Sequence, residues 1–252
     1  MEKQSKYIES VLQVLHELGG SATSQEITEA VILKNNISDE ELNIKTKNGI
    51  SVVKNLIAWA KVNLQKSQDI FKTSTGVYVL SNASHKPSNE CRLMPDEYST
   101  DTQSIKEILI LELNSISPKG FERLIQRILR EYGFDKVIVT GRSSDGGIDG
   151  EGYYHLNPFI SMKVVFQCKR YKNNISSPMI RDFRGAMQGK ADNGIFITTS
   201  SFTKDAYKEG SRDGVYPIKL IDGSNLVDIM LDLKIGILND NQIDSDFFNE
   251  FK

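Results

Sequence analysis

The sequence predicts an α/β protein of two domains, the first mostly helical and the second built on a mixed β-sheet flanked by helices. Three observations lead to this expectation. Apolar residues recur at helical spacing three times in residues 1–81, before two short alternating runs. Periodicity then disappears over residues 82–104, where Ser, Asn, Asp, Thr and Pro dominate. From residue 105 onward, helical stretches alternate with short apolar strands.

The first domain, residues 1–81, is expected to hold three helices and a hairpin. Apolar residues recur at helical spacing within residues 6–20, 21–32 and 49–67. Thr23 and Glu26 have the spacing of a capping box at the start of the second helix. Two alternating runs around the turn TSTG, within residues 69–81, indicate a hairpin. This order predicts a winged-helix module, whose third helix enters the major groove of DNA.

The third helix carries residues that can meet DNA. Lys54, Lys61 and Lys66 can contact phosphates, although an exposed helical face would look the same in the sequence. Trp59 is the single tryptophan, and we expect it in the core of the module because tryptophan is highly buried on average.

Residues 82–104 are expected to be a linker, made partly stiff by two prolines, and residues 105–252 a second domain. A helix over 105–116 precedes another in which Ser117 can cap and Pro118 can occupy the first turn. Three strands, a helix, a strand, a helix, a strand and a last helix are then expected at residues 136–141, 147–155, 161–171, 177–190, 193–200, 203–214, 216–223 and 224–233. This order implies a mixed central sheet covered on both faces.

The composition is that of an ordinary soluble protein, with 25% charged and 39% hydrophobic residues. No apolar run reaches the roughly 20 residues that span a bilayer, and the N-terminus lacks a signal-peptide core, so we expect a cytoplasmic protein without a membrane partner. Cys91 and Cys168 have no zinc spacing, which favours free thiols in a reducing compartment. The net charge is −2, but residues 116–223 hold 17 Lys+Arg against 12 Asp+Glu, which is compatible with a polyanion partner.

A constellation of polar residues lies around two of the expected strands. In VVFQCKRY, a buried strand ends in Gln167 and Lys169, which point to one face because strands have a period of two, while Cys168 points to the other face as a core thiol. The glycine-rich segment GRSSDGGIDGEG precedes them, and its Asp149 falls where a neighbouring strand begins. Adjacent strands could therefore bring Asp149, Gln167 and Lys169 to a shared edge.

These residue types suit phosphodiester chemistry. An aspartate and a nearby amide oxygen can hold a hard divalent cation, and a lysine beside it can stabilise charge on a phosphate. A turn aspartate and a strand-end lysine that reaches solvent would give the same local pattern. Asp145 is a second candidate ligand, although its place before paired glycines suggests a loop.

The chain resembles the Mrr-type restriction endonucleases, which are members of the PD-(D/E)xK nuclease superfamily. The resemblance rests on the ordered segments GFERLIQRILREYGF, TGRSSDGGIDGEG, FQCKRYKNNISSPMIRDFRGAM, GIFITTSSFTKDA and IKLIDGSNLVDIM. Residues 1–80, especially NLIAWAKVNLQKS and GVYVLS, resemble the winged-helix domain that precedes the family's catalytic domain. It covers nearly the whole chain, and the ordered set is more specific than any one motif.

The resemblance implies site residues one by one. Asp149 matches the metal-binding aspartate, Lys169 matches the catalytic lysine, and Gln167 takes the place that most of the superfamily fills with an acid, a variant usual in this family. Glu122 matches an acidic residue that assists the metal, although a glutamate there would also favour the helix dipole. The implied cofactor is Mg²⁺ (or Mn²⁺), with one or two ions.

The implied activity is a DNA endonuclease that hydrolyses phosphodiester bonds, leaves 5′-phosphates and restricts foreign methylated DNA, a type IV role. A DNA-binding regulator with a non-catalytic nuclease-like domain is one alternative, and a DNA repair or junction-resolving nuclease is another. Double-stranded DNA is the expected partner. A homodimer or larger homo-oligomer is also expected because two strand cuts need two active sites. The methylated base, the recognition sequence and the cut position are not encoded in any motif.

Arg181 and Arg184 lie on one expected helix, in SPMIRDFRGAMQ. Both can contact the DNA backbone, where arginine supplies sequence-independent affinity. A surface charge pair with the neighbouring Asp182 is an equally good interpretation of the same residues.

Overall fold

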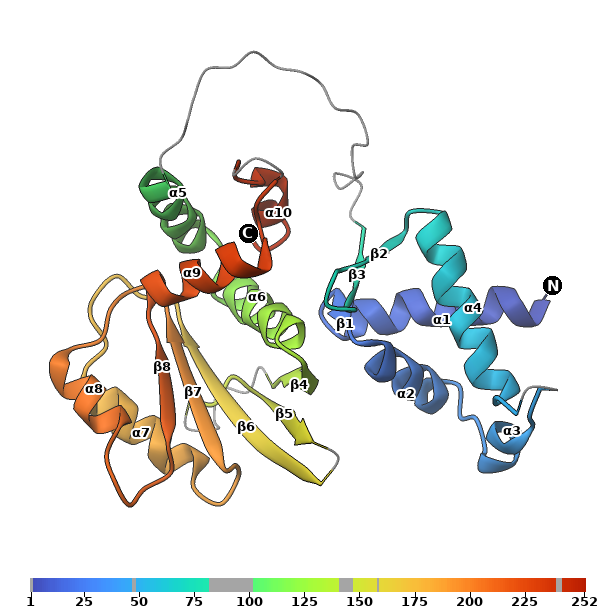
Figure 1. The fold of residues 1–252 in the computed structure, drawn as a ribbon, viewed down its shortest axis with the longest axis horizontal. Coiled ribbons are helices and arrows are strands. Elements are labelled where there is room, and N and C mark those ends of the chain that lie inside the picture. Colours follow the sequence, from blue (N-terminus) through green and yellow to red (C-terminus); the bar gives the residue numbers. More distant parts are fainter. Residues whose placement is uncertain (1, 47–48, 82–101, 141–146, 158, 239–241) are drawn as a thin grey trace, which may run out of the picture. The chain divides into compact units, whose positions relative to one another are not determined.

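The computed structural model describes residues 2–46, 49–81, 102–140, 147–157, 159–238 and 242–252. The chain divides into two compact units, Met1–Pro87 and Ser88–Lys252 (Figure 1). Most of the segment expected as a linker lies outside the described residues, as do Cys91 and Asp145. None of the described helices combines the length and the apolar character needed to cross a membrane.

The N-terminal unit is a winged helix, as predicted. Its elements are α1 (Glu2–Glu17), β1 (Ser21–Ala22), α2 (Ser24–Lys34), α3 (Asp39–Asn43), α4 (Val52–Lys66), β2 (Ile70–Lys72) and β3 (Tyr78–Leu80). The antiparallel sheet has the order β1-β3-β2, so β1 pairs with the second strand of the hairpin, β3. The capping box at Thr23 and Glu26 is confirmed, with Thr23 N donating to the Glu26 carboxylate at 2.7 Å.

The core of this unit forms where helical faces meet the hairpin. Val11, Leu15, Ile27, Ile57 and Leu64 are almost fully buried there. The position predicted for Trp59 is wrong, because 53% of this side chain is exposed on α4. The buried stripe of α4 runs through Val53, Ile57, Ala60 and Leu64, and residue 59 lies off that stripe.

The C-terminal unit is a five-stranded mixed sheet in the order β4-β5-β6-β7-β8. Strands β4 (Phe134–Val139), β5 (Gly150–Asn157) and β6 (Ile160–Lys169) are antiparallel neighbours. Strands β7 (Asn193–Thr198) and β8 (Ile218–Ile221) continue the sheet parallel to β6. The predicted succession of strands along the chain and the mixed character of the sheet are therefore confirmed.

Helices cover both faces of this sheet (Figure 1). One face packs on α6 (Pro118–Glu131) and α9 (Gly223–Leu233), whose core is extended by α5 (Thr102–Ser115) and α10 (Ser245–Asn249). The other face packs on α7 (Ser177–Met187) and α8 (Lys204–Gly210). Successive residues of β6 point into opposite hydrophobic cores: Phe166 packs with the first set of helices and Val165 with the second. Ser117 caps α6 by accepting from Gly120 N at 3.0 Å, as predicted.

Two helical glycines should respond oppositely to alanine. A Cβ on Gly120 would lie 1.8 Å from the backbone oxygen of Phe251, so Gly120→Ala must move the C-terminal segment off α6. A Cβ on Gly185 in α7 meets nothing within 4 Å. We expect Gly120→Ala to lower the free energy of unfolding by about 1–3 kcal/mol and Gly185→Ala to raise it by about 0.4–1 kcal/mol.

Urea denaturation followed by circular dichroism measures both changes. Equal effects of the two substitutions would contradict the close packing of α6 against the C-terminal residues.

Candidate active site

The candidate site lies where β5 begins and β6 ends. Asp149 immediately precedes β5, and its backbone N donates to the oxygen of Phe166 at 2.9 Å. The backbone N of Cys168 in turn donates to Asp149 Oδ2 at 2.6 Å. The carboxylate therefore reaches across from one strand to the peptide group that joins Gln167 to Cys168. This is the shared edge that the sequence predicted for these two strands.

Gln167 and Lys169 share one face of β6, and Cys168 packs with the core on the other face. The two residues pair with Phe196 and Thr198 of β7. Lys169 is further fixed through its backbone oxygen, which accepts from the Thr198 hydroxyl at 2.8 Å. Both polar side chains are half-buried, so they are held close to the sheet edge.

The glycine-rich segment passes close to Gln167. Gly147 has a φ of +94°, and a Cβ built on it would lie 2.3 Å from Gln167 Nε2. Glycine is required here both for the left-handed backbone and for the space that the amide occupies. The sequence did not indicate that this segment passes close to Gln167.

Glu122 of α6 is electrostatically coupled to the same edge. Burial raises the pKa of the half-buried Glu122, the negative charge of Asp149 raises it further, and Lys119 lowers it. Burial likewise raises the pKa of Asp149, while the Cys168 hydrogen bond and the Lys169 charge lower it. Asp149 is thus influenced by Lys169, and Glu122 is influenced by Asp149. Lys119, which counters the burial of Glu122, was not identified from the sequence.

The donor set suits a hard divalent cation. Asp149 and Glu122 offer carboxylate oxygens and Gln167 offers an amide oxygen, which are the ligand types that Mg²⁺ takes in proteins. Burial raises the pKa of both carboxyl groups, so a positive ion would stabilise their ionised forms. Within the described residues no group of three or more His, Cys, Asp or Glu side chains could hold a metal, so the amide would have to complete the set.

The lysines of α4 differ from one another in their surroundings. Lys54 is exposed, as a phosphate contact requires. Lys61 is only 4% exposed; its Nζ donates to Ser24 Oγ at 2.6 Å and lies 5.3 Å from the centroid of the Tyr78 ring. Burial lowers the pKa of Lys61, and Lys72 lowers it further. Lys61 thus ties α2 to α4, and this geometry gives its predicted role at DNA no support.

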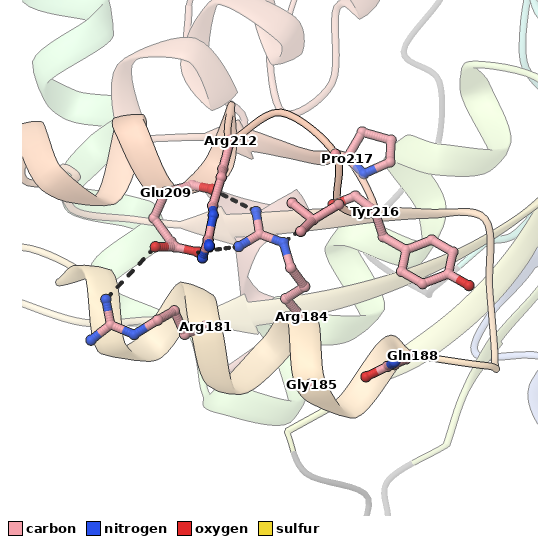
Figure 2. Close-up of a pocket in the computed structure, with 10 residues that line it drawn as sticks. Arg181, Arg184, Gly185, Gln188, Glu209, Arg212, Tyr216 and Pro217 are labelled. Atoms are coloured by element: carbon pink, nitrogen blue, oxygen red, sulfur yellow. Dashed lines mark hydrogen bonds and ion pairs between the residues drawn. The ribbon is translucent and has the colours of Figure 1, made fainter.

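Arg184 is held inside the protein by Glu209 of α8 (Figure 2). Both side chains are only 12% exposed. Arg184 also donates to the backbone oxygens of Glu209 at 2.5 Å and of Tyr216 at 3.3 Å. It therefore joins α7 to the end of α8 and to the loop before β8, which leaves little of it for DNA.

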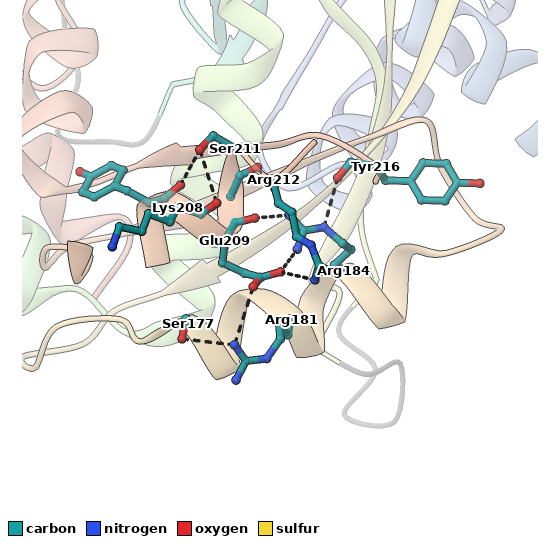
Figure 3. Close-up of polar contacts among 10 residues, drawn as sticks. Ser177, Arg181, Arg184, Lys208, Glu209, Ser211, Arg212 and Tyr216 are labelled. Carbon is teal, nitrogen blue, oxygen red and sulfur yellow. Dashed lines mark hydrogen bonds and ion pairs between the residues drawn. The ribbon is translucent and has the colours of Figure 1, made fainter. Parts of the chain in front are cut away.

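Arg181 and Arg212 lie farther from the same carboxylate (Figure 3). Their nitrogens are 3.7 and 3.9 Å from Glu209 oxygens, and their side chains are 52% and 61% exposed. These residues line a cavity of about 750 Å³. The cavity borders the segment that leads into β8. From the register of β6, β7 and β8, this segment lies about 16 Å from Lys169, measured along the strand direction. It is distinct from the candidate active site.

Comparisons with known proteins agree with this architecture. Residues 113–230 match the catalytic-domain family of Mrr, described as "Restriction endonuclease", and residues 5–87 match the Mrr N-terminal domain. The type IV methyl-directed restriction enzyme EcoKMrr of Escherichia coli (strain K12) is 27% identical over an alignment of 300 positions, gaps included. This alignment covers 96% of this chain and 97% of that enzyme. An uncharacterized mitochondrial protein of Schizosaccharomyces pombe is 30% identical over 92 residues, 35% of this chain and 37% of that protein.

Two solved structures of restriction endonucleases resemble part of the chain, each with a TM-score below 0.5. MspJI restriction endonuclease, in complex with a 27-mer oligonucleotide, has a TM-score of 0.47 and 22% identity. The alignment covers 68% of this chain and 39% of that chain. The DNA modification-dependent restriction endonuclease AspBHI has a TM-score of 0.46 and 16% identity, over 67% of this chain and 57% of that one.

A winged helix followed by a mixed sheet with helices on both faces is the architecture of a DNA-binding module joined to a restriction-endonuclease-like domain. Two Mrr domains match in order and together take in most of the residues. The chain belongs to the Mrr family of restriction endonucleases.

Arg184→Ala should destabilise the protein more than Arg181→Ala. Removal of Arg184 takes the buried partner from a nearly buried Glu209 carboxylate and removes the donor to the backbone oxygen of Tyr216. We expect a loss of about 3 kcal/mol, the lower end of the range for breaking a buried pair, because Arg181 and Arg212 remain nearby. The exposed Arg181 should cost less than about 1 kcal/mol. Urea unfolding of both variants decides the matter, and equal losses would contradict the clamp.

The raised pKa values of Asp149 and Glu122 predict a pH effect on stability. A carboxyl whose pKa is higher in the folded than in the unfolded state holds its proton more tightly when folded, so stability falls as pH rises through the folded pKa. The asparagine in Asp149→Asn cannot ionise, and its amide oxygen can still accept the hydrogen bond from Cys168 N. We expect this variant to unfold at higher urea concentration than the wild type at pH 7.5 in EDTA, with the difference shrinking toward pH 4.

The exposed Asp182, replaced by Asn, is the matched control and should show no such pH-dependent gain. A wild type more stable than Asp149→Asn at pH 7.5 would show that ionised Asp149 supports the fold.

Proposed function

We propose that this restriction endonuclease cuts foreign double-stranded DNA that carries methylated bases, with Mg²⁺ (or Mn²⁺) as cofactor and 5′-phosphates on its products. The observation that carries the proposal is the hydrogen bond from Cys168 N to Asp149 Oδ2. It holds a carboxylate at the end of β6, where Gln167 and Lys169 share one face. The similarity to a methyl-directed enzyme over nearly the whole chain supports the methylated substrate.

Each residue of the site has a role in this proposal. Asp149, Glu122 and the amide oxygen of Gln167 would hold the ion. When bound, the ion would polarise the scissile phosphate and lower the pKa of the attacking water. The ammonium group of Lys169 would stabilise the negative charge that develops on the phosphate oxygens in the transition state. Gln167 contributes no charge, so the negative charge that would offset a bound cation comes from Asp149 and Glu122.

The two units divide the work in this proposal. The winged helix would bind the target DNA with α4 in the major groove, and the C-terminal unit would cut. A homodimer or larger assembly would supply the two active sites that a double-strand break needs. The enzyme would act in the cytoplasm, where foreign DNA first meets the host.

Plasmid cleavage tests this function. The wild type should cut methylated plasmid in Mg²⁺, leave unmethylated plasmid intact and be inactive in EDTA. Lys169→Ala should cut more slowly by a factor on the order of 10²–10³, as when one electrostatic donor to a transition state is removed. Lys190→Ala is the control, because that lysine is exposed in the turn between α7 and β7, at the other end of the sheet.

Equal, negligible cleavage by wild type and Lys169→Ala, with both proteins folded, would contradict the proposal and favour a DNA-binding regulator. Preferential cutting of a branched substrate over a linear one would instead favour a junction-resolving nuclease.

A further inference from the structure

The outward face of α4 presents an apolar surface to solvent. Trp59 is 53% exposed and Val62 is 39% exposed, and Val62 lies between Trp59 and the exposed Ala58 around the same side of the helix. An indole left in water forgoes part of the favourable free energy of burial. A half-exposed tryptophan beside two further apolar side chains therefore marks a surface suited to contact.

The rest of the helix is rigidly held, so this surface cannot turn inward. Val53, Ile57, Ala60 and Leu64 anchor the opposite face in the core. Lys61 adds a polar tie, through its hydrogen bond to Ser24 at the start of α2. The apolar surface is thus presented in one fixed orientation by the helix that a winged fold inserts into the major groove.

The charges around the apolar surface favour a nucleic acid as its occupant. Lys54 and Lys66 are exposed near the two ends of α4 and make no ion pair with another residue in the described part of the chain. Twelve residues of helix separate them, which is about 18 Å. The major groove is about 12 Å wide, so both cations can reach phosphates while the residues between them face the bases.

An apolar surface in the major groove discriminates between base edges. Unmodified cytosine and adenine present hydrogen-bonding groups there, and covering these with an indole leaves polar groups without partners, which is unfavourable. A methyl group at C5 of cytosine or at N6 of adenine projects into the same groove and gains from apolar contact. This is the behaviour that a thymine methyl shows with apolar side chains.

We propose that Trp59, together with Ala58 and Val62, is the surface that reads the methyl group of a modified base in the major groove. This inference rests on the proposed function and deepens it by assigning methyl recognition to one face of α4. Lys54 and Lys66 contribute affinity that does not depend on methylation.

Metal-free binding separates recognition from cleavage. The full-length chain is titrated in EDTA with three versions of one DNA fragment: unmethylated, methylated at C5 of cytosine, and methylated at N6 of adenine. The wild type is expected to prefer one methylated form by at least about fourfold, the worth of one buried methyl group. Because the sequence contains a single tryptophan, its fluorescence reports directly on this contact and should change more with the preferred fragment.

Trp59→Ala is expected to bind all three fragments with nearly equal affinity, and Trp59→Phe to keep part of the preference. Lys54→Ala should weaken binding to all three while keeping their ratio. Leu33→Ala is the matched control, because Leu33 is an apolar side chain of α2 that is 79% exposed. It should behave as the wild type does.

The outcomes separate this inference from the proposed function. A Trp59→Ala protein that keeps the wild-type ratio overturns the inference and leaves the function standing. A wild type that binds all fragments equally overturns the inference as well. The plasmid assay then shows whether methyl-dependent cleavage also fails. Unchanged tryptophan fluorescence on saturation with the preferred fragment would place the contact elsewhere.

Discussion

The hydrogen bond from Cys168 N to Asp149 Oδ2 is the contact on which the candidate active site depends. It joins the residue before β5 to the end of β6, and the antiparallel register of these strands brings the two segments within reach. The register is in turn held by the two hydrophobic cores, because Val165 and Phe166 are buried on opposite faces of the sheet. A one-residue slip would exchange those faces and carry Gln167 and Lys169 to the wrong side.

The ionised carboxylates at this edge of the sheet are disfavoured by burial, and a bound cation would offset that cost. Burial raises the pKa of Asp149 and of Glu122, and Asp149 raises that of Glu122 further. The same burial raises the pKa of the Cys168 thiol well above its usual value, which keeps that side chain neutral beside the carboxylates. A third carboxylate at position 167 would add repulsion to a pair that already disfavours ionisation. The neutral amide avoids this cost and still offers an oxygen.

The sequence was most informative where a local period or spacing decides the structure. The period of two on β6 placed Gln167 and Lys169 together, and the capping patterns at Thr23 and Ser117 located two helix starts. Short elements were missed, because α3 and β1 are too brief to show a period. The sequence does not show which atoms Asp149 contacts. Its role as a metal ligand stays a prediction, which the hydrogen bond from Cys168 N supports.

Errors arose where the partner of a side chain is distant in sequence or where a residue type suggested its location. Arg184 looked available for DNA, but Glu209 lies 25 residues away and no local pattern reveals the pair. Lys61 looked similar to Lys54, yet its partner Ser24 lies on another helix. Trp59 was assigned to the core by residue type, although the buried stripe of α4 excludes position 59. Because of that error, the sequence did not predict the exposed apolar surface of α4 to which we assign recognition of the methylated base.

The central claim is that one divalent ion binds between the start of β5 and the end of β6. Titration with Mn²⁺, followed by paramagnetic broadening of backbone amide signals, locates such an ion without requiring catalysis. We expect the signals of Gly147, Cys168 and Lys169 to broaden first, and Asp149→Asn to remove the effect. Broadening centred on Glu209, or none near Cys168 at saturating Mn²⁺, would contradict it.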